Sequence, residues 1–336
     1  MGLSADREIL YSKLIEVSSR TPAINLSGFP IPNNNRIVLK LEFLNPVRTI
    51  HLRVYPYVFR RAELLGYIQP GQTPVIEASL GNAGAAFVYC ANVLGYNSPS
   101  PPRVIAPENI TAGRRELLTE LGAEISYSPK ERYNLGYVEA LEREVGHSRS
   151  ITAGKLGSDP SRLYVVTKTE EGARSAYKAL VDEAVASCVE YSIPMISHFV
   201  GIVGSGTSIS GIGGRLKEIN PDSKIFAAEA DDFRNTTSLL NRRKPLPLDL
   251  VPKDFPMLAA IGVPHNRLGL NVDIIDGVIQ FDRGEIHAIQ EAVCDIVGFN
   301  VGLSTAGTLL SALRLAEEIV DKTILVCAYD EMDKWI

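Results

Sequence analysis

Short apolar runs alternate with longer amphipathic stretches along this chain, and the alternation limits the folds available to it. The runs are rich in Val and Ile, whereas the stretches between them repeat apolar residues at helical spacing. Strands are expected at 37–41, 74–77, 103–106, 124–127, 196–203, 224–228 and 323–328. Helices are expected at 53–66, 82–94, 111–121, 132–146, 170–191, 208–219, 283–297 and 304–319. The pattern favours an α/β fold with mainly parallel sheets.

Composition narrows the function classes. The 336 residues carry a net charge of −5, which argues against a general nucleic-acid binder, and 45% hydrophobic residues suffice for a packed core. No stretch is apolar over the roughly 20 residues that cross a bilayer. The four cysteines form no CxxC pair and are expected to be reduced thiols, which indicates a soluble, cytoplasmic protein. The five histidines lack metal-ligand spacing, so no metal site is predicted.

A glycine-rich turn follows the apolar run at 196–203. It consists of Gly204, Ser205, Gly206, Thr207 and Ser208, and a helical pattern continues from it. The start of a helix presents free N–H groups, and the hydroxyls add further donors, so the turn suits a phosphate or carboxylate. The named nucleotide motifs fail here, because neither GxGxxG nor a P-loop lysine is present. A tight packing turn remains the other interpretation.

Two further turns precede predicted helices. One contains Ser79, Gly81 and Asn82, and the other contains Ser304. Each is also explained by helix capping alone. In an α/β fold such turns lie at the carboxyl ends of strands, where ligands collect.

Together with further segments, these turns resemble the β family of pyridoxal-phosphate (PLP) enzymes, or fold type II, which includes cysteine synthase, cystathionine β-synthase and threonine dehydratase. Residues 21–26 (TPAINL) are similar to the family's TPLVxL, residues 40–46 (KLEFLNP) to its KLExxNP, and residues 121–124 (LGAE) to its LGAEV. The resemblance implies a two-domain, three-layer αβα architecture like the tryptophan synthase β-subunit. It implies a large domain from 1–42 plus 150–336, a small domain from 43–149, and a homodimer.

The resemblance also implies roles for the turns. Gly204–Ser208 falls where the family binds the cofactor phosphate, Asn82 where it contacts the ring hydroxyl, and Ser304 where it contacts the pyridine nitrogen. Ser79 and Gly81 fall in the loop that binds the substrate carboxylate. In that loop Leu80 and Ala83 replace hydroxyl residues of the family's TSGNTG, so an amino-acid substrate would lose hydrogen bonds.

The largest departure follows the Asn-Pro pair. The family reads roughly TGSxKDR there, with a lysine that forms the Schiff base with PLP, and this chain reads VRTIHLR with His51 at that position. An imidazole has no primary amine, so it cannot form that bond. Lys40 matches the ordinary lysine of KLE and is no substitute. Arg48 replaces a small residue, and we expect it to fill cofactor space or to bind an anion.

Two functions remain open. The first is a pseudoenzyme on a cysteine-synthase-like scaffold, which binds a small anionic metabolite in an interdomain cleft and holds PLP non-covalently at most. The second is an enzyme of cysteine or serine metabolism, a PLP-type lyase or transferase that catalyses β-replacement or elimination, or one with changed chemistry in which His51 acts as acid or base.

Overall fold

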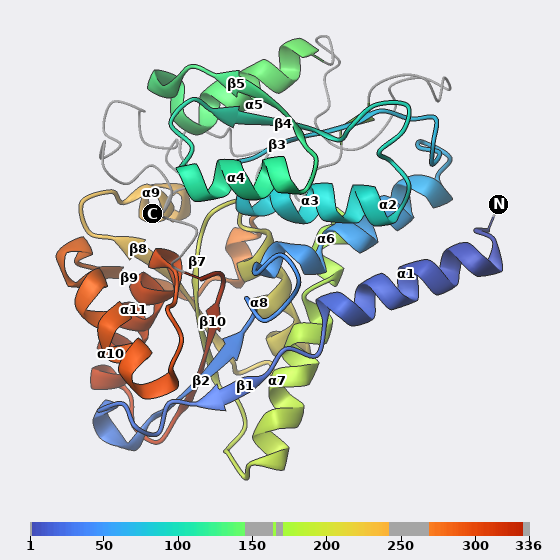
Figure 1. Ribbon diagram of the computed structural model, residues 1–336. Coiled ribbons are helices and arrows are strands. Elements are labelled where there is room, and N and C mark those ends of the chain that lie inside the picture. Colours follow the sequence, from blue (N-terminus) through green and yellow to red (C-terminus); the bar gives the residue numbers. More distant parts are fainter. Residues whose placement is uncertain (1, 145–163, 166–170, 242–268, 332–336) are drawn as a thin grey trace. The chain divides into compact units, whose positions relative to one another are not determined.

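The structure is a computed structural model that describes residues 2–144, 164–165, 171–241 and 269–331 (Figure 1). It is an α/β fold with two mostly parallel sheets, as predicted. The chain divides into two compact units. Unit 1 contains the described residues of Met1–Ser19 and His51–Ala173, and unit 2 contains those of Arg20–Ile50 and Arg174–Asp333.

Unit 2 is built on a six-stranded sheet in the order β1-β2-β10-β7-β8-β9. These strands are β1 (Ala23–Asn25), β2 (Arg36–Leu41), β10 (Thr323–Ala328), β7 (His198–Ile202), β8 (Lys224–Ala230) and β9 (Gly277–Phe281). All neighbouring pairs are parallel except β1 with β2. The carboxyl ends of β2, β10, β7 and β8 therefore meet at one edge of the sheet, where ligands bind in folds of this class.

Helices lie on both faces of this sheet (Figure 1). They are α7 (Lys178–Glu190), α8 (Thr207–Ile219), α9 (Asn235–Leu240), α10 (Ile286–Val297) and α11 (Leu303–Glu318), with the short α6 (Glu171–Ser175) at the boundary between the units. Gly213 of α8 packs on Ile225, and Gly277 packs on Phe226. Ile225 and Phe226 are consecutive in β8 and point to opposite faces. Gly307 of α11 packs on Phe281, which shares the face of Gly277, so α8 and α11 cover opposite faces.

Unit 1 contains a four-stranded parallel sheet in the order β5-β4-β3-β6. The strands are β3 (Val75–Ala78), β4 (Arg103–Pro107), β5 (Glu124–Ser128) and β6 (Tyr164–Val165). The helices are α1 (Ala5–Ser18), α2 (Tyr55–Leu64), α3 (Asn82–Val93), α4 (Ala112–Glu120) and α5 (Tyr133–Glu144). Gly84 of α3 packs on Val104, whereas Leu141 of α5 packs with Ile105. Alternation along β4 puts α3 and α5 on opposite faces, so this unit also has three layers.

Helix α1 belongs to unit 1 because a buried carboxylate fixes it there. Glu63 of α2 accepts hydrogen bonds from the Arg7 guanidinium and from the hydroxyls of Tyr11 (2.7 Å) and Tyr96 (2.8 Å). Burial and the charge of Glu63 raise the pKa of both tyrosines, so their hydroxyls stay protonated as donors. The compact units meet along the chain at residues 19/20, 50/51 and 173/174.

Other differences from the predicted elements have local causes. The helix expected at 170–191 is broken into α6 and α7, and the break brings the carbonyl of Arg174 against Gly211 of α8. Strand β9 was not predicted, because it is an edge strand whose residues are mostly half-buried and whose apolar signal is weak. The 3₁₀ helices are η1 (Pro32–Asn34), η2 (Ile50–Arg53), η3 (Lys130–Arg132), η6 (Val272–Ile274) and η7 (Arg283–Glu285).

The described residues bear on the expectations for membrane-spanning helices, metal sites and cysteines. Within them, no helix is both long and apolar enough to cross a membrane, and no cluster of His, Cys, Asp and Glu is arranged to hold a metal ion. The four cysteines are unbonded to one another; Cys90, Cys188 and Cys327 are buried and Cys294 is half-buried. Burial raises the pKa of the Cys90 and Cys188 thiols, which keeps them protonated and unreactive.

Candidate functional site

In unit 2 the candidate residues gather at the carboxyl edge of the large sheet. The Gly204–Ser208 turn follows β7, Arg48 follows β2, and the Tyr329–Glu331 segment follows β10. Because β2, β10 and β7 are parallel neighbours, these segments lie at the same edge. The Tyr329 hydroxyl accepts a hydrogen bond from Ile202 N (3.2 Å), which ties the ends of β10 and β7 together.

The glycine turn has one side packed against protein and one side open. Gly206 is the N-cap of α8 and has φ of 80°, and a Cβ there would lie 2.4 Å from Cβ of Leu270. Gly269 packs equally closely on Thr207. Gly204, in contrast, is exposed, and a Cβ there would meet no atom within 4 Å. The open side of this turn is therefore the side of Gly204.

The helix start that this turn opens has the electrostatics of an anion site. Helix α8 has 13 residues, and its N-cap, Gly206, has no side chain to bond the first N–H groups. The hydroxyls of Ser205 and Thr207 lie 3.1 Å apart and hydrogen-bond to each other. Ser208 is half-buried in the first turn. The backbone donors of a helix start, together with the half-buried hydroxyls of Ser205 and Ser208, can bind a phosphate or a carboxylate.

Ser304 lies in the first turn of α11. Its carbonyl accepts a hydrogen bond from the Thr308 hydroxyl (2.7 Å), and its side chain is half-buried. The next residue, Thr305, accepts a hydrogen bond from Tyr329 N (3.1 Å) through its hydroxyl. The start of α11 is therefore bonded to the segment after β10, at the same edge of the sheet as the glycine turn.

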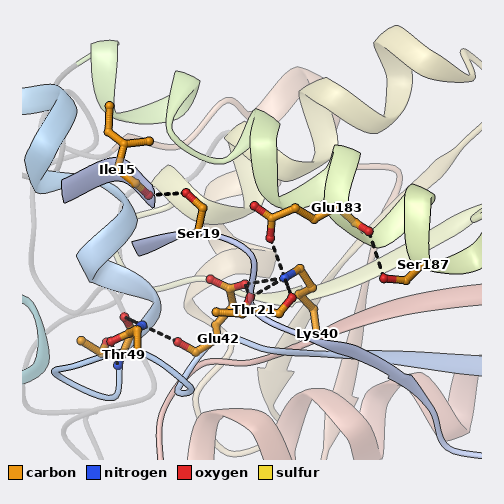
Figure 2. Close-up of polar contacts among 9 residues, drawn as sticks. Ile15, Ser19, Thr21, Lys40, Glu42, Thr49, Glu183 and Ser187 are labelled. Carbon is orange, nitrogen blue, oxygen red and sulfur yellow. Dashed lines mark hydrogen bonds and ion pairs between the residues drawn. The ribbon is translucent and has the colours of Figure 1, made fainter. Parts of the chain in front are cut away.

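Lys40 is fully covered and bonded on several sides (Figure 2). Its ammonium donates to the carbonyl and hydroxyl oxygens of Thr21, forms a 2.8 Å ion pair with Glu183, and lies 3.3 Å from Glu42. The Thr21 hydroxyl donates to Glu42 in turn (2.6 Å). An amine with no exposed surface and these partners cannot reach a carbonyl ligand, so Lys40 does not replace a Schiff-base lysine.

In unit 1, His51 lies in η2, directly before α2. Its ring is half-buried, with Nδ1 covered by protein, and its carbonyl accepts a hydrogen bond from Val54 N (3.0 Å). Four residues further on, the Tyr55 hydroxyl donates to the buried carboxylate of Glu77 (2.8 Å). Glu77 is two residues before Ser79, so this hydrogen bond connects the segment after His51 to the strand that carries the Ser79 turn.

The Ser79 turn is closed by its own side chains. The Ser79 hydroxyl is buried and accepts hydrogen bonds from Gly81 N (3.1 Å) and Gly84 N (2.8 Å), so it caps the start of α3 from two residues before the N-cap residue, Gly81. Gly81 has φ of 132°, and the Arg114 side chain packs beneath it, 2.6 Å from the position of a Cβ. Arg114 also donates to the Leu80 carbonyl (3.1 Å). Asn82 is the first residue of α3 and is half-buried.

The structure thus brings the predicted residues together in two sets. Arg48, Gly204–Ser208 and Ser304 belong to unit 2, and His51, Ser79, Gly81 and Asn82 belong to unit 1. Sequence reasoning missed Leu270, Arg114 and Glu331, which support Gly206, Gly81 and Arg48 respectively. These contacts join distant segments, and only the glycines themselves gave a local signal that something packs closely there.

Comparison with known proteins agrees with this architecture. Residues 16–330 match the family model described as pyridoxal-phosphate dependent enzyme. The chain is 25% identical to cysteine synthase B of Pseudomonas aeruginosa over 331 residues, which cover 98% of this chain and 97% of that protein. It is also 25% identical to a probable cysteine synthase of Bacillus subtilis over 308 residues, 91% of this chain and 90% of that protein.

Solved structures show the same fold. The O-acetylserine dependent cystathionine β-synthase from Helicobacter pylori superposes with a TM-score of 0.76 at 22% identity, over 96% of each chain. At that identity the likeness establishes the fold alone, whereas the family match extends over most of the sequence. The chain belongs to the family of pyridoxal-phosphate dependent enzymes, on a scaffold of the cysteine synthase and cystathionine β-synthase type.

Proposed function

We propose that this protein is a non-canonical member of its family that binds a small phosphate- or carboxylate-bearing ligand at the start of α8 and forms no covalent bond to PLP through residue 51. The observation that carries this proposal is the glycine turn. It combines an uncapped helix start, a hydroxyl pair and an open side at Gly204. Residue 51 is a histidine, which has no amine, and the amine of Lys40 is fully buried.

The residues of the α8 turn fit the phosphate of PLP, but residue 51 cannot form the covalent attachment to it. Within unit 2, Gly204–Ser208 would hold the phosphate, and Ser304 would contact the ring nitrogen. PLP, when bound, supplies an electron sink for reactions of amino acids. An imidazole at position 51 can hold or move a proton but cannot make the covalent attachment. A ligand held by its phosphate alone would exchange freely with other phosphate compounds.

The test compares wild-type protein with His51→Lys. Each is incubated with PLP, reduced with borohydride, and analysed by peptide mass spectrometry for a pyridoxyl group. We expect phosphate-competed, non-covalent PLP binding to the wild type, and a covalent adduct at residue 51 in the variant only. A pyridoxyl group on any lysine of the wild type contradicts the proposal, as does absence of binding of both PLP and inorganic phosphate.

A second candidate is an active enzyme of amino-acid metabolism, and the full-length similarity to cysteine synthases favours it. It would be a lyase or transferase that catalyses β-replacement or elimination, with or without His51 as acid or base. Release of sulfide, acetate or pyruvate from cysteine or O-acetylserine by the wild type would establish it. Loss of that activity in both His51→Ala and His51→Gln would assign proton transfer to the imidazole.

A further inference from the structure

Arg48 has a strained backbone that its surroundings hold in place. Its φ is 52°, in the left-handed region that a residue other than glycine enters at a cost. The Asn45 side chain fixes the turn, because its amide donates to the carbonyls of Glu42 (2.7 Å) and Thr49 (2.8 Å) and its oxygen accepts from Val47 N and Thr49 N. Strain that neighbours enforce in this way is a mark of functional positions.

A residue distant in sequence, Glu331, orients the guanidinium of Arg48. Nη1 lies 2.9 Å from Oε2 of Glu331, in an ion pair whose arginine is 57% exposed and whose glutamate is 19% exposed. Glu331 forms a β-bridge with Val301, and Asp330 forms one with Thr49. The Asp330 carbonyl also accepts a hydrogen bond from Gly302 N (2.9 Å). The exposed guanidinium is thereby held at the edge of the sheet where α11 begins.

Two positive features therefore adjoin the segment after β10. One is the guanidinium, and the other is the N-terminus of α11, which has 16 residues and the half-buried Ser304 in its first turn. A carboxylate matches a guanidinium in geometry and charge. An anion that reaches Arg48 must compete with Glu331, whereas a neutral molecule of the same shape gains nothing from breaking that ion pair.

We propose that Arg48 is the specificity-determining residue for a carboxylate-bearing ligand of the amino-acid class, and that Glu331 is the internal carboxylate with which this ligand competes. The inference rests on the proposed function, because it names the chemistry that the same edge of the sheet selects. Glu331 lowers the affinity for every ligand that must displace it. It raises selectivity, since only a negatively charged ligand compensates for the lost ion pair.

The test measures binding of L-serine and of its neutral analogue L-serinamide to purified full-length protein by calorimetry. Wild type should prefer L-serine. Arg48→Gly should lose that preference by about tenfold, and Glu331→Gln should bind L-serine about threefold more tightly because the competing carboxylate is gone. Arg48→Gly should also melt no lower than wild type, because glycine relieves the strain. A structural arginine would instead lower the melting temperature.

Arg20 provides a matched control, since it is an exposed arginine of the same unit with φ of 58°. Arg20→Gly removes the same charge and the same kind of strain, and it should keep the wild-type preference. The inference is overturned if wild type does not prefer L-serine to L-serinamide, or if Arg48→Gly and Arg20→Gly behave alike. Inorganic phosphate titrated into Arg48→Gly separates the two proposals, because phosphate binding that survives this substitution reports on the α8 turn alone, and its loss in wild type and variant alike would count against the α8 turn only.

Discussion

The turns that precede α3 and α8 both contain a serine and a glycine, but the serine hydroxyls make different hydrogen bonds in the two turns. Before α3, the Ser79 hydroxyl takes up two N–H groups of its own turn, and Arg114 fills the space beneath Gly81. Before α8, the N-cap is likewise a glycine, Gly206, but the hydroxyls of Ser205 and Thr207 bond each other. A serine before a helix thus bonds the N–H groups of the helix start in one turn and a neighbouring hydroxyl in the other.

The largest effect is expected where the α8 turn faces protein. Gly206→Ala places a Cβ on a backbone with φ of 80° and 2.4 Å from Leu270. We expect a loss of about 2–5 kcal/mol in the free energy of unfolding, measured by urea denaturation. A variant with wild-type stability would show that Leu270 does not pack on this turn.

Gly204→Ala tests the open side of the same turn. A Cβ there meets no atom within 4 Å, so the free energy of unfolding should change by less than about 0.5 kcal/mol. Because the methyl group would occupy the ligand's approach, the affinity for inorganic phosphate should fall about tenfold, or about 1.4 kcal/mol, by calorimetry. Unchanged phosphate affinity would place the anion elsewhere and remove the contrast between the two turns.

Ser79→Ala tests the closed turn. Removal of the cap of α3 should cost about 1 kcal/mol in thermal or chemical unfolding, and phosphate binding should stay at the wild-type level. Ser12→Ala is the control, because Ser12 is an exposed serine within α1 that bonds only a helix carbonyl in the described contacts. If phosphate binding falls with Ser79→Ala, then the α3 turn also takes part in anion binding.

The smallest effect is expected at Ser205. Ser205→Ala removes one hydroxyl donor from the α8 turn, so phosphate affinity should fall about threefold with no measurable change in unfolding. Ser205→Thr keeps the hydroxyl and should restore the affinity. An unfolding free energy lowered as much as in Ser79→Ala would mean that the Ser205 hydroxyl stabilises its turn as Ser79 does.

Much of the fold was readable because its cause is local. Runs of apolar residues predict the strands β2, β4, β7, β8 and β10, and the Gly-Ser-Gly-Thr sequence predicts a helix start. The contact that fixes Arg48 joins residues 283 positions apart, and no periodicity encodes it. Ser79 shows a second limit, since a serine that bonds the N–H groups of its own turn has the same sequence signature as one expected to contact a ligand.

The position of β10 has a consequence for how the protein is made. This strand, Thr323–Ala328, lies between β2 and β7 in the middle of the large sheet, yet it follows both of them, and also β8 and β9, along the chain. Until it emerges from the ribosome, β2 and β7 have no partner on their facing edges, and unit 2 cannot close its core. Truncation before residue 323 should therefore yield two exposed strand edges, on β2 and β7, rather than a shortened but folded sheet.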